Sequence, residues 1–161
     1  SATSSTSALS RRVGLGKVEI AHAPAQLTAI LGSCVGIAFY DSQTATGTLA
    51  HVVMPEGNSK ACVEADHARQ AIKESRTMRE QAGCNLDNVS AKRAGGAKLF
   101  GNNKVRDRGH EHLTAVCRAV EDANVELNGE DLGGSKGRRV TLDAQTGDLL
   151  IETPGEDSMT L

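Results

Sequence analysis

Two apolar runs separated by a polar turn occupy residues 35–54, which read VGIAFY, DSQTATG and TLAHVVM. Both runs contain β-branched residues, and the first also contains two aromatic ones, types that favour strands, while the turn is rich in Asp, Ser, Thr and Gly. The pattern predicts a β-hairpin with strands at 35–40 and 48–54. The connection at 41–47 leaves the register open, and a slip of one residue would turn every side chain to the opposite face.

The segments around this hairpin predict a mixed sheet and two main helices. A helix is expected from Ser59, a suitable N-cap, to Gln81, with Gly83 as its stop. A second helix is expected at 113–120, where apolar residues recur at i, i+3, i+4 and i+7. Further strands are expected at 13–20, 27–31, 89–93 and 125–127, with a second hairpin at 139–142 and 148–151. This order, without a strict βαβ repeat, predicts an α/β fold in the broad sense, or α+β.

The length of 161 residues suits one domain. The N-terminal residues are small and polar and lack the apolar stretch of a signal peptide. We therefore expect residues 1–12 to be a disordered tail or a non-native remnant, 13–152 to be the domain, and 153–161 to be a C-terminal tail. A cytoplasmic location is expected, and no apolar run approaches the length of about 18 residues that a membrane span requires.

Composition excludes several classes of protein. The net charge of −2 lacks the basic footprint of a nucleic-acid binder, and the aromatic content of 2% leaves few rings on which bases could stack. The core is expected to consist of Ala, Val, Leu and Ile.

The four cysteines show no C-x-x-C spacing of the kind that zinc and redox sites use: Cys34, Cys62, Cys84 and Cys117.

Cys34 is the cysteine whose surroundings most suggest chemistry; Cys62, near the start of the expected long helix, stays open as an acidified thiol but has no motif around it. It follows a Gly-Ser turn and precedes an apolar strand in the sequence LGSCVG, residues 31–36. Such a turn can expose the sulfur and aim backbone N–H groups at a developing oxyanion. The alternative is a buried structural thiol, because free cysteine is among the most buried residue types.

A nucleophilic cysteine needs a base, and His51 is the histidine that stands out. It is the one polar residue in the apolar segment LAHVVM, residues 49–54. A half-buried imidazole needs partners for its nitrogens, so His51 is either a core histidine bonded to the backbone or a catalytic base. Because the hairpin register is open, the sequence allows Cys34 and His51 to meet without establishing it.

Six short segments are similar, in order and spacing, to the motifs of one family. They are LGSCV at 31–35, LAHVVMP at 49–55, AGGA at 94–97, EDLGG at 130–134, GRRV at 137–140 and TG at 146–147. Together they span most of residues 13–152 and resemble the chemoreceptor glutamine deamidase family, CheD. Each Gly-rich piece alone is weakly specific, and none carries the pattern of a P-loop.

The resemblance implies a catalytic set and a fold. The set comprises the Cys of the Gly-Ser-Cys turn, the His of the Ala-His strand and a Thr six residues before the Cys, here Cys34, His51 and Thr28. The implied fold has mixed β-strands in a layered sheet or sandwich with helices, similar to cysteine-dependent deamidating toxin domains. Without the resemblance, Thr28 would be an ordinary β-branched strand residue.

The resemblance also implies a reaction and partners. Cys34, poised by His51, would convert glutamines on the cytoplasmic helices of methyl-accepting chemoreceptors to glutamate through a thioester, and no metal or organic cofactor is required. A CheC-type phosphatase is the expected second partner. The alternatives are a non-catalytic or weakly catalytic regulatory binding module for receptors and CheC, and a cysteine hydrolase of small amides.

Overall fold

The computed structural model describes residues 9–53, 61–85, 89–97, 118–121, 123 and 125–161, with only the helical backbone described for 61–65. Its strands form two five-stranded sheets. Sheet A has the order β1 (Ser10–Arg12), β3 (Gln26–Leu31), β8 (Arg138–Asp143), β9 (Leu149–Glu152), β10 (Met159–Thr160). Sheet B has the order β2 (Val18–His22), β5 (Thr46–Val52), β4 (Val35–Asp41), β6 (Val89–Gly95), β7 (Glu126–Leu132).

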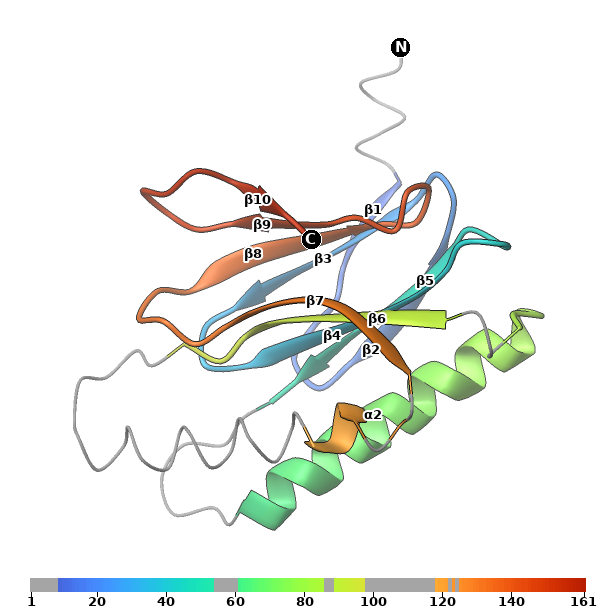
Figure 1. Cartoon of the computed structure of the whole chain (residues 1–161), viewed down its shortest axis with the longest axis horizontal. Coiled ribbons are helices and arrows are strands. Elements are labelled where there is room, and N and C mark those ends of the chain that lie inside the picture. The colour runs from blue at the N-terminus through green and yellow to red at the C-terminus, as the bar shows by residue number, and fades with distance from the viewer. Residues whose placement is uncertain (1–8, 54–60, 86–88, 98–117, 122, 124) are drawn as a thin grey trace.

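The two sheets face each other, and helices cover the outer face of sheet B, as Figure 1 shows. The long helix α2 (Ala61–Gln81) corresponds to the helix predicted at 59–81, whose proposed N-cap, Ser59, lies outside the described residues. Residues 118–121 are also helical, at the end of the second predicted helix, most of which lies outside the described residues. The predicted mixed α+β fold with layered strands and two helices is therefore confirmed.

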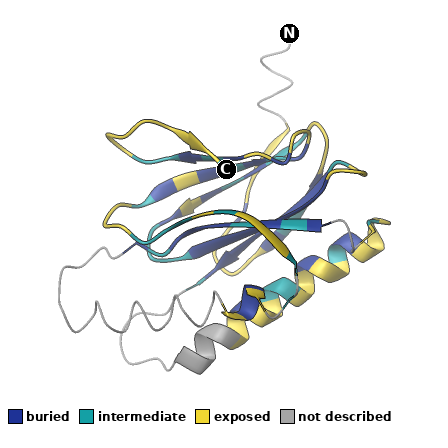
Figure 2. Ribbon diagram, in the orientation of Figure 1, coloured by how far each residue is buried: buried dark blue, intermediate teal, exposed yellow. Residues whose placement is uncertain are grey.

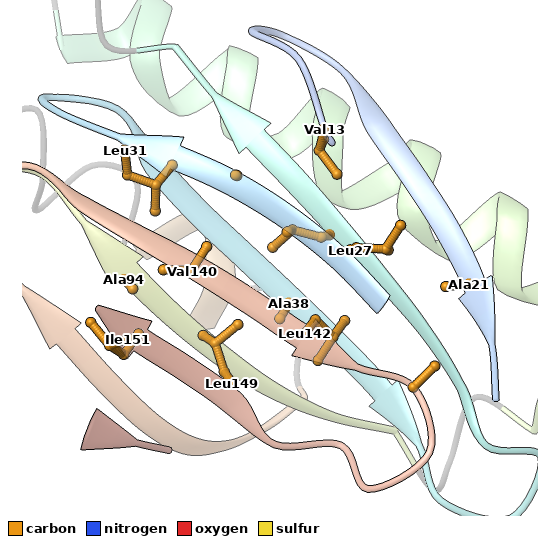
Figure 3. Close-up of a cluster of buried hydrophobic side chains, with 13 residues drawn as sticks. Val13, Ala21, Leu27, Leu31, Ala38, Ala94, Val140, Leu142, Leu149 and Ile151 are labelled. Carbon is orange, nitrogen blue, oxygen red and sulfur yellow. The ribbon is translucent and has the colours of Figure 1, made fainter. Parts of the chain in front are cut away.

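Two apolar cores separate these layers. Between the sheets the core contains only Val, Ala, Leu and Ile among its buried members, as the composition predicts. Figure 3 shows side chains from β3, β8 and β9 meeting in this layer. The second core lies between sheet B and the helices and contains the fully buried Phe39, so the prediction of a core made of Ala, Val, Leu and Ile is wrong at this position. Figure 2 shows the outward face of α2 exposed, as expected for an amphipathic helix.

Both predicted hairpins are confirmed. β4 pairs antiparallel with β5, and β8 pairs antiparallel with β9. The strand expected at 13–20 is wrong in its first half, because β2 begins only at Val18. The segment before it instead hydrogen-bonds to both sheets, as described below.

The sheets extend beyond the boundaries of 13 and 152 that the sequence suggested for the domain. Strand β1 pairs parallel with β3, and β10 pairs antiparallel with β9. Both short strands are exposed and lie at the edges of sheet A, which explains why they carry no apolar pattern. None of the helices in the described part of the chain is long and apolar enough to cross a membrane.

Candidate active site

The β4–β5 register fixes the faces on which Cys34 and His51 lie. Gly36 on β4 is directly opposite His51 on β5. On β5, Leu49 belongs to the inter-sheet core and Ala50 to the helix-side core, so alternation places His51 on the inter-sheet face. Cys34 lies two residues before Gly36 and packs against the same inter-sheet core. Both side chains therefore belong to the inter-sheet side of sheet B, with Cys34 in the turn just before β4 and His51 on β5.

The His51 ring is buried, with an exposed fraction of 5%. Its Nδ1 lies 3.1 Å from the backbone carbonyl oxygen of Val13. A carbonyl can only accept a hydrogen bond, so Nδ1 carries a hydrogen, and in the neutral form of the ring the lone pair is then on Nε2. Nε2 is buried and finds no hydrogen-bond partner among the described residues. A buried base with its lone pair unpaired is suited to taking a proton from a neighbouring thiol.

The segment from Val13 to Lys17 holds His51 through its backbone as well. The His51 amide donates to the Lys17 carbonyl at 3.0 Å, and the Gly16 amide donates to the His51 carbonyl at 2.9 Å. Val13 also donates its amide to the Thr28 carbonyl of sheet A at 2.7 Å. This segment therefore connects sheet A with the histidine of sheet B.

Thr28 is not placed beside the His51 ring. On β3, Leu27, Ala29 and Leu31 point into the inter-sheet core, so alternation puts the Thr28 side chain on the outer face of sheet A. Its partner across the ladder is Thr141 of β8, on the same outer face. The connection that the structure shows between Thr28 and His51 runs through the backbone: the Thr28 carbonyl holds Val13, and the Val13 carbonyl holds the ring.

The turn that carries Cys34 is anchored by the end of β6. The Gly96 amide donates to the Cys34 carbonyl at 2.8 Å, and the Ala97 amide donates to the Gly32 carbonyl at 3.0 Å. Gly95, at φ 109°, lies so close that a Cβ there would collide with the Cys34 carbonyl oxygen. The glycines of the AGGA segment thus allow the backbone of β6 to approach the cysteine turn.

The other cysteines and histidines are not brought to this site where the structure describes them. Cys84 is a thiol beside the Thr44 hydroxyl, and His22 bonds Thr46 at the opposite end of β5. The side chain of Cys62 and the residues Cys117, His110 and His112 lie outside the described part of the chain. Within that part, no group of three or more His, Cys, Asp or Glu residues is arranged to hold a metal ion.

Sequence reasoning missed the Val13 carbonyl as the partner of His51. A main-chain acceptor carries no residue-type signature, and the strand expected at 13–20 would have used that carbonyl in a ladder. It also missed the buried guanidinium of Arg138, for which a signal existed. Arg138 alternates with Val140 and Leu142, two inward-facing residues of β8, whereas its neighbour Arg139 is exposed.

The fold and this site together define an α+β sandwich with a cysteine and a histidine on one face of its inter-sheet core. Residues 53–153 match the family model described as CheD chemotactic sensory transduction, which covers more than half of the chain. The chain belongs to the CheD family.

Individual relatives agree with this assignment over nearly the whole chain. The probable chemoreceptor glutamine deamidase CheD of Methanococcus maripaludis is 33% identical over 147 residues, covering 90% of this chain and 96% of the relative. The chemoreceptor glutamine deamidase CheD of Bacillus licheniformis is 33% identical over 149 residues, covering 88% and 89% of the two chains. The solved structure of the hypothetical protein YfiH from Bacillus licheniformis has a TM-score of 0.40 at 13% identity, covering 69% of this chain and 49% of that one.

Proposed function

We propose that this protein is a chemoreceptor glutamine deamidase in which Cys34 is the nucleophile and His51 the general acid–base. The observation that supports the proposal is the Gly36–His51 register pair, beside the packing of Cys34 against the inter-sheet core. It is joined by the burial of His51 Nε2 without a hydrogen-bond partner among the described residues. Family membership supplies the substrate class, because the curated relatives are named for deamidation of chemoreceptor glutamines.

Acylation starts when Nε2 of His51 takes the proton of the Cys34 thiol. The thiolate attacks the side-chain carbonyl carbon of a receptor glutamine and forms a tetrahedral intermediate. Backbone N–H groups around Ser33 and Cys34 are proposed to donate to its oxyanion. In support of this arrangement, the carbonyls of Gly32 and Cys34 are both engaged by the end of β6, which fixes the turn. The C–N bond then breaks, and the His51 imidazolium gives its proton to the departing ammonia.

Deacylation runs the same proton transfers through water. His51 Nε2 removes a proton from a water molecule, whose oxygen attacks the thioester carbonyl. The carbon–sulfur bond breaks, the products are a glutamate side chain and the Cys34 thiol, and the histidine returns to its neutral form. The Val13 carbonyl keeps the ring oriented and stabilises the imidazolium, the part that a carboxylate plays in serine proteases.

Thr28 is proposed to serve as the third member of the set through its backbone. Its carbonyl accepts the amide of Val13, whose own carbonyl accepts from His51. Under this proposal Thr28 supports the orientation of the imidazole without contact between the hydroxyl and the ring.

The protein is further proposed to act in the cytoplasm and to bind a CheC-type phosphatase as a second partner. This part rests on the family resemblance. Co-sedimentation of the purified protein with a CheC-type phosphatase tests it, and separate sedimentation of the two proteins would contradict it.

The experiment that tests the activity incubates the protein with cytoplasmic fragments of chemoreceptors and maps glutamine-to-glutamate conversion by peptide mass spectrometry. The wild-type protein is expected to convert specific glutamines, and Cys34→Ala is expected to convert none. Cys84→Ala is the matched control, because Cys84 is a thiol of similar burial beside Thr44. Equal conversion by wild type and Cys34→Ala would refute the assignment of the nucleophile. Binding of receptor fragments without conversion would favour the regulatory binding module.

A further inference from the structure

Arg138 is a buried cation at the cysteine end of the inter-sheet core. It is the first residue of β8, and its exposed fraction is 6%. Alternation with Val140 and Leu142, which belong to the inter-sheet core, places it on the inward face of sheet A. A buried guanidinium is costly unless it is satisfied by hydrogen bonds, so its partners indicate why it is there.

The Arg138 guanidinium donates hydrogen bonds to the end of β7 and to the loop that leads from β7 to β8. Nη1 donates to the Asp131 carbonyl at 2.8 Å and to Asp131 Oδ2 at 2.9 Å. Nη2 donates to the Gly133 carbonyl and, at 3.3 Å, to the Lys136 carbonyl. Three of these four acceptors are backbone carbonyls, so the side chain fixes the course of the loop.

That loop is joined by hydrogen bonds to the turn that carries the nucleophile. The Gly133 amide donates to the Gly95 carbonyl at 2.8 Å, and the next residue, Gly96, donates its amide to the Cys34 carbonyl at 2.8 Å. On the other side of the turn, Gly137 leaves so little space that a Cβ there would lie 3.2 Å from the Leu31 carbonyl oxygen. A continuous path therefore runs from the guanidinium through Gly133 and the end of β6 to Cys34.

We propose that Arg138 is a positioning residue for the proposed deamidation: through the end of β7, the loop at 133–137 and the end of β6 it positions the Cys34 turn relative to His51. This inference rests on the proposed function. His51 lies on β5, on one side of β4, and the arginine network reaches β6 and β7, on the other. The cysteine turn, which leads into β4, is held between the two.

Arg138→Lys tests this role because it keeps the charge and removes the planar fork that reaches four acceptors. The readout is the pH dependence of Cys34 alkylation by iodoacetamide, followed by peptide mass mapping on the full chain. In the wild type the pH midpoint is expected below about 8.5, the value of a free thiol, because His51 stabilises the thiolate. In Arg138→Lys the midpoint is expected to rise toward that value. Receptor deamidation is expected to slow by about 10–100-fold in kcat, with KM little changed.

Arg79→Lys is the matched control. Arg79 is equally buried, at 3% exposed, but it lies on α2, donates to Thr48 Oγ1 at 2.9 Å and stacks on the Phe39 ring at 4.5 Å. Burial lowers the pKa of the Arg79 guanidinium to about 10. Its substitution is expected to lower the melting temperature while leaving the Cys34 alkylation midpoint unchanged.

Circular dichroism establishes that each variant is folded at the assay temperature. A folded Arg138→Lys with the alkylation midpoint of the wild type would overturn the proposal, as would an equal shift in folded Arg79→Lys. Should Arg138→Lys fail to fold, Asp131→Asn decides, since it weakens the same network at a partly exposed carboxylate. A smaller shift in the same direction supports the proposal, and no shift refutes it. Failure of the proposed function is recognised separately, as a wild type that alkylates normally at Cys34 and converts no receptor glutamine.

Discussion

The two ends of the inter-sheet core differ in whether their buried polar atoms have hydrogen-bond partners. At the far end from Cys34, polar side chains cross the gap and are satisfied: the Tyr40 hydroxyl donates to the Ala144 carbonyl at 2.8 Å. Lys92 Nζ donates to the carbonyls of Gly147 and Leu161 at 2.9 and 2.7 Å. At the cysteine end, turns rich in glycine pack backbone against backbone. There, His51 Nε2 and Arg138 Nε are buried without a partner among the described residues.

This difference distinguishes the end of the core that holds the two sheets together from the end that is proposed to carry the reaction. Satisfied hydrogen bonds across two sheets hold the layers together and leave no atom available for chemistry. Burying His51 Nε2 without a described partner costs stability, a cost that fits a group proposed to exchange a proton. We therefore expect substitutions at the cysteine end to reduce activity and those at the tyrosine end to reduce stability.

The largest effect is expected from His51→Asn. The amide nitrogen of asparagine can take the place of Nδ1 and donate to the Val13 carbonyl, while the basic Nε2 is lost. Loss of a general acid–base lowers the rate of deamidation by about 10²–10⁴-fold. Receptor conversion is measured together with the free energy of urea unfolding, which is expected to stay close to that of the wild type. A His51→Asn variant that deamidates receptors at the wild-type rate would contradict the reactive role proposed for the cysteine end of the core.

A smaller effect is expected from Gly95→Ala, which forces a Cβ against the Cys34 carbonyl. Gly83→Ala is the matched control, since Gly83 also has a positive φ, 85° against 109°, and nothing lies within 4 Å of the added carbon. The left-handed backbone costs about 1–2 kcal/mol at both positions. Gly95→Ala is expected to lose more unfolding free energy and also to slow the alkylation of Cys34. Equal losses in the two variants, with unchanged alkylation, would show that the contact with the turn is unimportant.

The smallest effect is expected from Tyr40→Phe at the satisfied end. Removing the phenolic hydroxyl leaves the Ala144 carbonyl without this donor and costs about 1 kcal/mol at neutral pH, with deamidation unchanged.

The difference in stability between the wild type and Tyr40→Phe is expected to change with pH in a direction that the pKa of Tyr40 sets. Burial, followed by the charges of Asp143, Asp41 and Asp148, raises the pKa of Tyr40 above its ordinary value of 10.0. The unfolded chain therefore ionises first as pH rises, and wild-type stability falls above about pH 10. Tyr40→Phe lacks this contribution, so its free energy of unfolding is expected to decline less than that of the wild type between about pH 9 and 11. Parallel declines, measured by urea unfolding across this range, would contradict the assignment.

The sequence predicted the parts of the fold whose partners are close along the chain. The β4–β5 and β8–β9 hairpins and the helix α2 follow from local apolar periodicity and turn residues. The parallel pairings of β1 with β3 and of β6 with β7 were not predicted, because they join distant segments. Strand β7 reads ELNGEDL and is largely exposed, so it shows no alternation that would reveal its full length.

For the site, the residue types were predictable and their orientations were not. Cys34 stood out by its turn and His51 by its apolar surroundings, but their common face depends on the hairpin register, which the connection at 41–47 does not specify. Thr28 was singled out only by resemblance, and its side chain lies on the outer face of sheet A. The Val13 carbonyl, which orients the imidazole, could not be read from side-chain identity at all.

The bridge that Val13 forms between the sheets has a consequence for the order in which the site can assemble. The group that orients the His51 ring comes from the beginning of the domain, Val13, and the group proposed to position the Cys34 turn comes from near its end, Arg138. Contacts of such long sequence separation form slowly, because the chain loses the entropy of closing large loops before the contacts contribute stabilising free energy. A nascent or partly folded chain would thus carry Cys34 as an ordinary thiol. Its reactivity would emerge only with the completed sandwich, so the rate of alkylation during refolding would time the closure of the two sheets.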